Sequence, residues 1–155
     1  MSYPSDNSLH RIVFSAILST ERVIKGRIMV MKSNNTQQQP DPVRVLTQAV
    51  TNAAELMGLN KAALARILGI SAASAGRMVA GQYQLNQNTK EWDMALLLVR
   101  LFRSLDAIMA GDENALRGWL KSPNLGLNAT PLELMSDAAG LVHTVDYVDS
   151  YRARV

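Results

Sequence analysis

The stretch Lys61-Ala-Ala-Leu-Ala-Arg-Ile-Leu-Gly-Ile-Ser-Ala-Ala-Ser-Ala-Gly-Arg-Met78 carries the strongest fold signal in this chain. Gly69 stands where a left-handed residue can end one helix at little cost, and Ser71 can cap the next helix. Ala65 is small where the two helices must approach closely, and Ile70 can be buried in the corner. Aliphatic side chains recur at helical spacing before the turn: Leu64, Ile67 and Leu68. Together these features predict a helix-turn-helix, the motif that lays its second helix in the major groove of DNA.

The second helix offers few side chains that could read bases. Only Arg77 can make the bidentate guanine contact, which is worth about 1–3 kcal/mol of discrimination. The residues predicted to contact DNA are Lys61, Ser71, Ala72, Ala73, Ser74, Arg77 and Gln82. Gly76 weakens the helix by about 1 kcal/mol relative to alanine, and it would allow a close backbone approach to DNA or to a neighbouring helix. The alternative is a helix-turn-helix kept only for folding or dimerisation.

The composition is that of a folded protein with a mildly basic charge. The 155 residues are 48% apolar and 19% charged, and the net charge of +3 permits nucleic-acid contact without requiring it. The charge is uneven, because residues 41–85 hold four basic and two acidic residues, whereas residues 122–155 hold two basic and four acidic residues. The positive field therefore lies on the helix-turn-helix half, and phosphate would repel the C-terminal end.

Several function classes find no support in the sequence. The absence of cysteine rules out a disulfide framework and suits a reducing cytoplasm. With two histidines, His10 and His143, and no cysteine, the sequence does not favour a conventional zinc site. The chain has no Gly-rich phosphate loop, paired-carboxylate signature or nucleophile elbow, and no apolar run of about 18 residues that would form a transmembrane helix. We therefore expect a cytoplasmic protein that is not an enzyme, with no membrane span, catalytic residue, metal or cofactor.

Turn signals divide the chain into three parts. Residues 1–40 form a tail and polar linker, of which residues 1–30 either precede the true start or form an amphipathic arm. Residues 41–110 hold the helix-turn-helix and a long helix over about 89–110. That helix is apolar on two sides, so we expect it to bridge two cores and to form a dimer seam. Residues 111–155 form a small helical domain. No strand alternation occurs, so the predicted fold class is all-α.

Capping signals mark the expected helix starts. Asp41 precedes a proline, and Asn60 precedes the first helix of the helix-turn-helix. Thr130-Pro-Leu-Glu133 combines a cap residue, a first-turn proline and an acidic third position, which predicts another helix start. Ser136 or Asp137 then opens the last helix.

The last helix carries an aromatic stripe. His143, Tyr147 and Tyr151 recur at i, i+4 and i+8, so they share one helix face. Aromatic residues with polar tips are favoured anchors for a partner, and packing against the long helix is the alternative. Asp146 and Asp149 are expected on a solvated face.

The C-terminal half resembles the Xre/MbcA/ParS antitoxin family. The resemblance is carried by KEWDMALLLVRLFRSLD (90–106), WLKSPNLGLNATPLEL (119–134), Gly-Leu-Val (140–142) and Val-Asp-Tyr-Val-Asp (145–149). It covers roughly residues 42–155. The elements that are fairly specific in this order and spacing are Pro123-Asn124, Pro131-x-Glu133 and Gly140-Leu-Val.

This resemblance implies a type II antitoxin of a toxin–antitoxin system. In the family the helix-turn-helix dimerises and binds operator DNA, and the C-terminal domain covers the active site of a RES-domain toxin, an NAD-degrading enzyme normally encoded beside the antitoxin. The chain departs from the family at Asn128-Ala129, where a Gly pair is usual. The residues expected to contact the toxin are Asn124, His143, Tyr147, Tyr151, Arg152, Arg154 and Val155. A frayed C-terminal end is the alternative for the last of these, and a stand-alone transcriptional regulator is the alternative for the whole chain.

Overall fold

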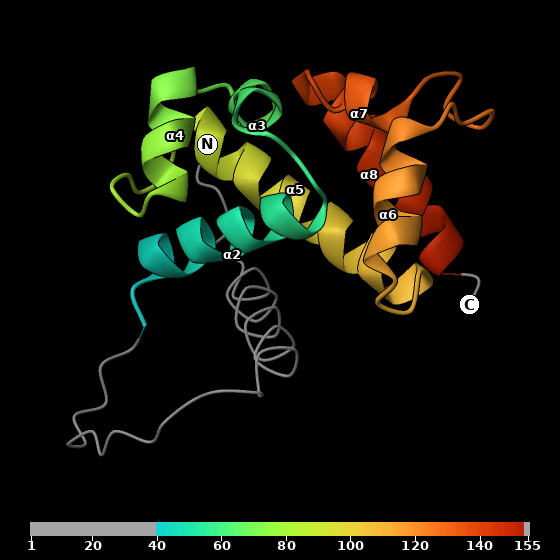
Figure 1. Ribbon diagram of the computed structural model, residues 1–155, viewed down its shortest axis with the longest axis horizontal. Coiled ribbons are helices and arrows are strands. Elements are labelled where there is room, and N and C mark those ends of the chain that lie inside the picture. The colour runs from blue at the N-terminus through green and yellow to red at the C-terminus, as the bar shows by residue number, and fades with distance from the viewer. Residues whose placement is uncertain (1–39, 154–155) are drawn as a thin grey trace, which may run out of the picture.

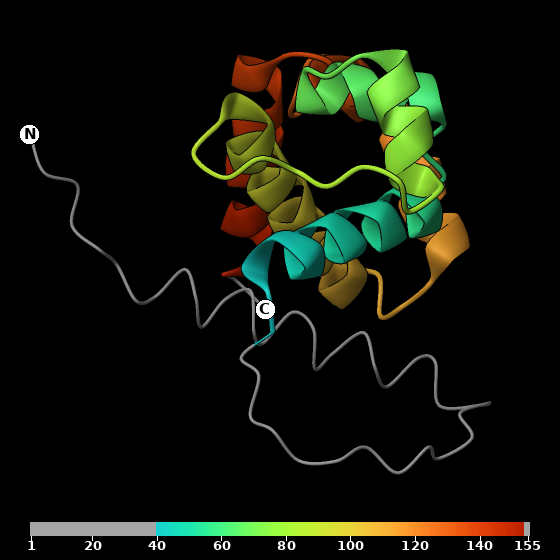
Figure 2. The same cartoon turned by 90° about the vertical axis from the view of Figure 1, so that its left-hand side faces the viewer.

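Every regular element in the described part of the chain is a helix. The computed structural model describes residues 40–153, which form seven helices with no strand among them (Figures 1 and 2). In chain order these helices are α2 (Pro42–Leu56), α3 (Lys61–Leu68), α4 (Ala72–Val79), α5 (Lys90–Ile108), α6 (Glu113–Lys121), α7 (Pro131–Leu134) and α8 (Ala138–Arg152). The predicted all-α fold class is confirmed, whereas residues 1–39 and 154–155 lie outside the described part.

The predicted local signals shape the helix-turn-helix, which is α3 and α4. Gly69 ends α3 with φ of 70°, and the N–H of Ile70 donates to the carbonyl of Ala65 at 3.0 Å. Between α3 and α4 the chain bends by 113°. Four predicted caps accept a backbone N–H from the first turn of their helices: Asp41, Asn60, Ser71 and Asp137. None of the described helices is by itself long and apolar enough to cross a membrane, and α3 with α4 meets that length and composition only as a bent pair.

Helix α5 is the element that both halves of the molecule share. It contacts α2, α3 and α8 (Figure 1). One cluster of buried apolar residues runs from α2 to α8. The half-buried residues of α5 include Trp92, Leu96 and Val99. Its buried residues are Met94, Ala95, Leu98, Leu101, Phe102, Ser104 and Leu105. Ile108, the last residue of α5, is 40% exposed. The reason is that α5 ends there and the chain turns away through Ala110 and Gly111, which both have positive φ.

The C-terminal half is a small assembly of α6, α7 and α8. Helix α7 begins after Thr130, as the start signal predicts, but it ends at Leu134 after four residues. The Thr130 hydroxyl makes no capping bond. The first turn of α8 approaches this point closely. A β-carbon on Gly140 would overlap the carbonyl oxygen of Leu134 and lie 2.7 Å from its carbonyl carbon. Glycine at this position therefore sets how tightly α7 and α8 pack.

Candidate functional site

The residues predicted to contact DNA lie on α4 and beside it. Six of them are exposed and Ser74 is half-buried; the exposed ones are Lys61, Ser71, Ala72, Ala73, Arg77 and Gln82. A β-carbon on Gly76 would meet no atom within 4 Å. No neighbouring helix of the described chain therefore requires this glycine. A close approach to DNA, or to a helix of another molecule, is compatible with this geometry.

Arg77 is held in place by its neighbours. Its Nη2 donates to the hydroxyl of Ser74 at 3.2 Å, and its Cζ lies 6.0 Å from the centroid of the Tyr83 ring. The Ser74 hydroxyl also lies 3.0 Å from the hydroxyl of Ser71, whose oxygen caps α4 by accepting the Ser74 N–H. The side chain that can read a guanine is thus oriented before any DNA arrives, which lowers the ordering cost of the contact.

Tyr83, in the loop after α4, was not predicted from the sequence as a site residue. Its hydroxyl donates to the Glu91 carboxylate, with distances of 2.9 and 3.0 Å to the two oxygens. The backbone N–H and side-chain amide of Asn86 donate to the same carboxylate at 2.7 and 2.9 Å. Burial, followed by the hydrogen bond to Glu91, raises the pKa of Tyr83 above its ordinary value. The start of α5 therefore fixes the aromatic ring against which Arg77 lies.

The loop between α6 and α7 is closed by Asn124. Its side-chain oxygen accepts the N–H groups of Gly126 and Leu127 at 2.9 and 3.1 Å, and its own N–H donates to the carbonyl of Ala129 at 3.0 Å. Asn128 adopts φ of 56°, whereas Ala129 is not among the residues with positive φ. The departure from the usual Gly pair is thus tolerated, because the left-handed position is occupied by asparagine. The side-chain oxygen of Asn124, which we expected at the toxin interface, is engaged within the loop.

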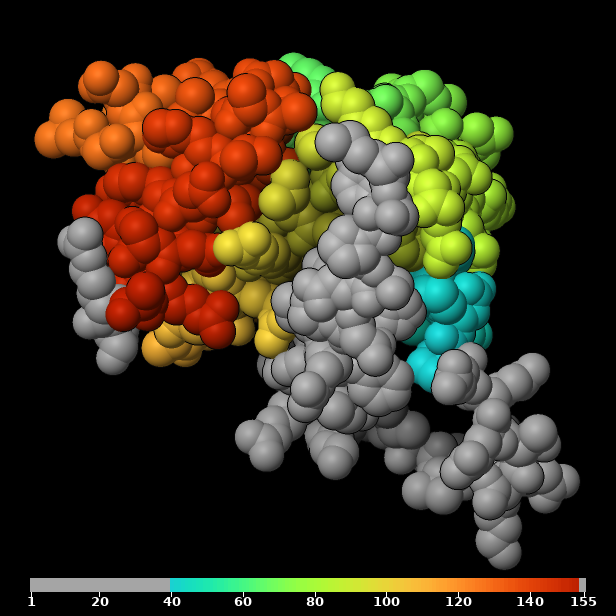
Figure 3. Space-filling model, turned by 180° about the vertical axis from the view of Figure 1, so that it is seen from behind, coloured from blue at the N-terminus to red at the C-terminus, as the bar shows by residue number. Residues whose placement is uncertain are grey.

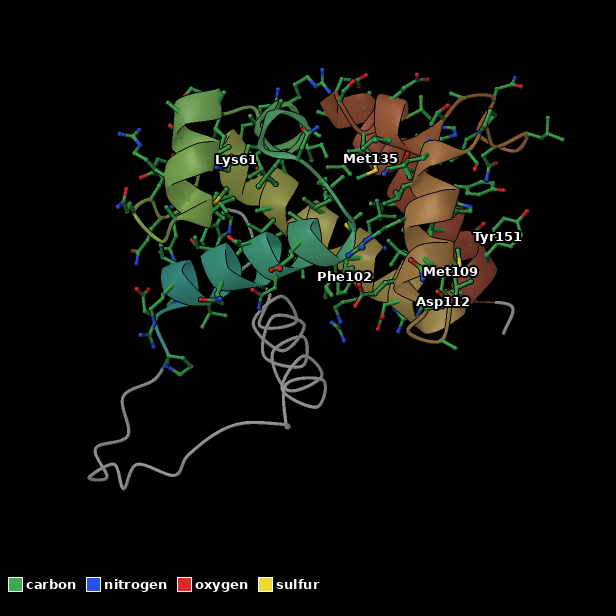
Figure 4. All side chains as sticks on the ribbon, in the orientation of Figure 1. Lys61, Phe102, Met109, Asp112, Met135 and Tyr151 are labelled. Carbon is green, nitrogen blue, oxygen red and sulfur yellow. The ribbon has the colours of Figure 1, made fainter. Side chains whose placement is uncertain are left out.

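The aromatic stripe of α8 is partly packed and partly exposed. The rings of Tyr147 and Tyr151 lie 5.0 Å apart at 54°, and their hydroxyls are 3.4 Å apart. Tyr147 is half-buried against the α6–α7 loop, since a β-carbon on Gly126 would lie 2.6 Å from the tyrosine ring. His143 is exposed, and Tyr151 is 49% exposed at the outer edge of the molecule (Figure 4). Tyr147 therefore packs within the molecule, whereas His143 and Tyr151 are accessible to a partner.

Two arginines lie near the end of α8. Arg152 is exposed, and its positive charge lowers the pKa of Arg103, after the larger lowering effect of burial. The two guanidinium groups therefore lie close enough for their charges to interact. Arg154 and Val155, which we also expected to contact the toxin, lie outside the described residues.

The expectation for Asp149 is wrong. It is half-buried, and its carboxylate accepts a bond from the Arg100 Nε at 2.7 Å and from the hydroxyl of the fully buried Ser104 at 2.7 Å. Asp146 is exposed, as expected. The expectation failed for Asp149 because its partners come from α5, more than forty residues away in sequence. Asp149 therefore ties α8 to α5.

Arg117 joins α6 to the helix-turn-helix half. Its guanidinium donates to the carbonyls of Leu56 at 2.9 Å and Glu55 at 3.2 Å, at the C-terminal end of α2, and it also binds Glu113 at 2.9 Å. A positive side chain is favourable at this end of a helix, where the carbonyls lack helical partners. The two halves are consequently linked by a polar contact as well as by the common core.

The geometry defines a class of protein with two modules. A helix-turn-helix with an exposed second helix lies at one end of the long axis, and a small helical domain with an exposed aromatic edge lies at the other (Figures 1 and 3). The two modules are built around one helix, α5.

Two family models match the chain. One describes the antitoxin Xre-like helix-turn-helix domain and matches residues 37–100; the other describes the antitoxin Xre/MbcA/ParS C-terminal toxin-binding domain and matches residues 104–154. The chain therefore belongs to the Xre/MbcA/ParS antitoxin family. It is an antitoxin with a DNA-binding helix-turn-helix and a toxin-binding domain, as the sequence predicted. No curated protein matches the chain.

Proposed function

We propose that this antitoxin neutralises a RES-domain toxin in the cytoplasm by covering the active site in which the toxin degrades NAD. The observation that supports it best is the exposed edge of α8, where His143, Tyr151 and Arg152 are accessible on the domain whose family binds toxins. The proposed contact set consists of Asn124, His143, Tyr147, Tyr151, Arg152, Arg154 and Val155. Inhibition of this kind requires no catalytic group on the antitoxin, because a well-fitted surface that excludes substrate is sufficient.

The proposal extends to control of the antitoxin's own operon. We infer that the protein binds its operator as a homodimer, with Lys61 and Gln82 on phosphates and Arg77 on a base. The exposed face of α4 supports the DNA contact. The half-buried apolar face of α5, with Trp92 and Leu96, supports the dimer, since a second copy would cover it.

Replacing Arg77 by alanine is expected to relax operator preference. The loss of one bidentate contact costs about 1–3 kcal/mol, so the ratio of operator to non-specific binding should fall by about 5- to 150-fold. Gel-shift titrations on operator and scrambled duplexes at one salt concentration measure this ratio. Lys61→Ala is the control, because a phosphate contact affects both duplexes alike. An unchanged ratio for Arg77→Ala would exclude this residue as a base reader.

The toxin proposal is tested by co-expression with the gene beside the antitoxin gene, which we expect to encode a RES-domain toxin. Rescue of growth and a complex that co-purifies are the expected results. A matched pair of variants locates the surface: Tyr151→Ala should weaken rescue, whereas Val79→Ala, at the end of α4, should not. Toxicity that persists with the wild-type antitoxin, without a complex, would contradict the proposal.

A further inference from the structure

The α6–α7 loop, residues 122–130, presents one apolar side chain to solvent. Leu125 is 95% exposed, far more than the other large exposed apolar residues, whose exposed fractions run from 40% to 49%. The loop begins directly after α6, and it projects from the end of the molecule opposite α4 (Figures 1 and 3). Such exposure of a leucine contributes nothing to the stability of the isolated chain.

The loop that carries Leu125 is fixed in shape. Before the leucine, the side-chain oxygen of Asn124 accepts two backbone N–H groups of the loop, and the Asn124 backbone pairs with Ala129. On the other side, Gly126 fits so closely against the Tyr147 ring that a β-carbon could not be added without movement. A braced loop loses little conformational entropy when a partner covers it, so its exposed leucine can contribute nearly its full burial energy to binding.

The loop that carries Leu125 packs against the aromatic edge of α8. The neighbouring Gly126 touches Tyr147, and the Tyr147 ring contacts Tyr151. The exposed aliphatic side chain of Leu125 therefore stands on a fixed loop that packs against an aromatic ring with a polar tip. Apolar and aromatic side chains of this kind are enriched at the centres of protein interfaces.

We propose that Leu125 is the apolar anchor of the toxin interface and inserts into an apolar pocket on the toxin, with Tyr147 and Tyr151 closing around it. This inference rests on the proposed function and adds the residue that supplies binding energy. The toxin is favoured over DNA because the loop lies within residues 104–154, which match a toxin-binding domain, and because residues 122–155 are net acidic. A second copy of the chain is the competing occupant that the experiment must exclude.

The test uses the full-length antitoxin and the purified RES-domain toxin that we expect to be encoded beside it, with affinity measured by calorimetry. Leu125→Ala should bind the toxin about 10- to 100-fold more weakly, the range that burial of one leucine supplies. Because Leu125 is exposed, its replacement should leave the thermal midpoint and operator affinity unchanged. Val79→Ala removes apolar surface from the helix-turn-helix half and should leave toxin affinity unchanged.

The outcomes separate this inference from the proposed function. If the wild-type protein does not bind the RES toxin, the proposed function fails and this inference fails with it. If the wild-type protein binds and Leu125→Ala binds equally well, only the anchor is wrong. If Leu125→Ala instead reduces the mass of the free protein in light scattering and leaves toxin affinity intact, the loop is a contact between copies and the inference is overturned.

Discussion

Replacing Gly140 by alanine is expected to cost about 3 kcal/mol or more of unfolding free energy, because the added methyl group would be forced into the backbone of Leu134. A flexible side chain could move aside, but the atoms in the way belong to the last residue of α7. Relief therefore requires α7 and α8 to separate, which disturbs the buried neighbours Met135 and Leu141. Urea denaturation followed by circular dichroism measures the loss.

Gly118 provides the matched control for this prediction. It also lies within a helix, α6, yet a β-carbon there would meet no atom within 4 Å. Gly118→Ala should therefore stabilise the protein by about 0.5–1 kcal/mol through helix propensity. Equal stability changes in the two variants would show that the close approach of α8 to α7 has no energetic consequence.

Truncation of Leu101 to alanine is expected to destabilise both halves of the molecule together. Leu101 is fully buried on α5, between the two ranges matched by the family models, and a cavity at such a site costs about 2–5 kcal/mol. Because the buried cluster runs from α2 to α8 without interruption, we expect one cooperative transition rather than two.

The two tryptophans can report on the halves separately. Trp92 lies on α5 near the helix-turn-helix, and Trp119 lies on α6. Replacing one tryptophan by phenylalanine leaves the other as the only tryptophan that reports unfolding. The urea midpoint reported by Trp92 should equal the midpoint reported by Trp119, and Leu101→Ala should lower the two midpoints by the same amount. Midpoints that differ between the two probes would mean that the halves unfold independently.

Local sequence signals were sufficient for most of the helix boundaries. The caps at Asn60 and Ser71 and the turn at Gly69 depend on residues within three or four positions, so their chemistry is visible in the sequence itself. The start signal at Thr130 is confirmed, because α7 begins at Pro131. Its end after one turn, where the first turn of α8 lies against Leu134, is a tertiary feature that the local signal does not contain.

The long-range contacts that bring the site residues together could not be predicted from local sequence signals. Arg117 reaches carbonyls about sixty residues earlier in the chain, and Asp149 is bound by side chains from α5. Tyr83 could have been noticed as an aromatic residue six positions after Arg77, but its orientation depends on Glu91. Pairing between elements is set by packing, which no single-sequence periodicity encodes.

We propose that the toxin and operator DNA bind at opposite ends of one folded unit. The most direct test of this proposal follows NAD degradation by the RES toxin as purified antitoxin is added, with and without saturating operator DNA. We predict that the antitoxin abolishes NAD degradation at stoichiometric concentration, and that operator-bound antitoxin inhibits equally well. NAD degradation that continues at saturating antitoxin, or inhibition that operator DNA reverses, would contradict the account.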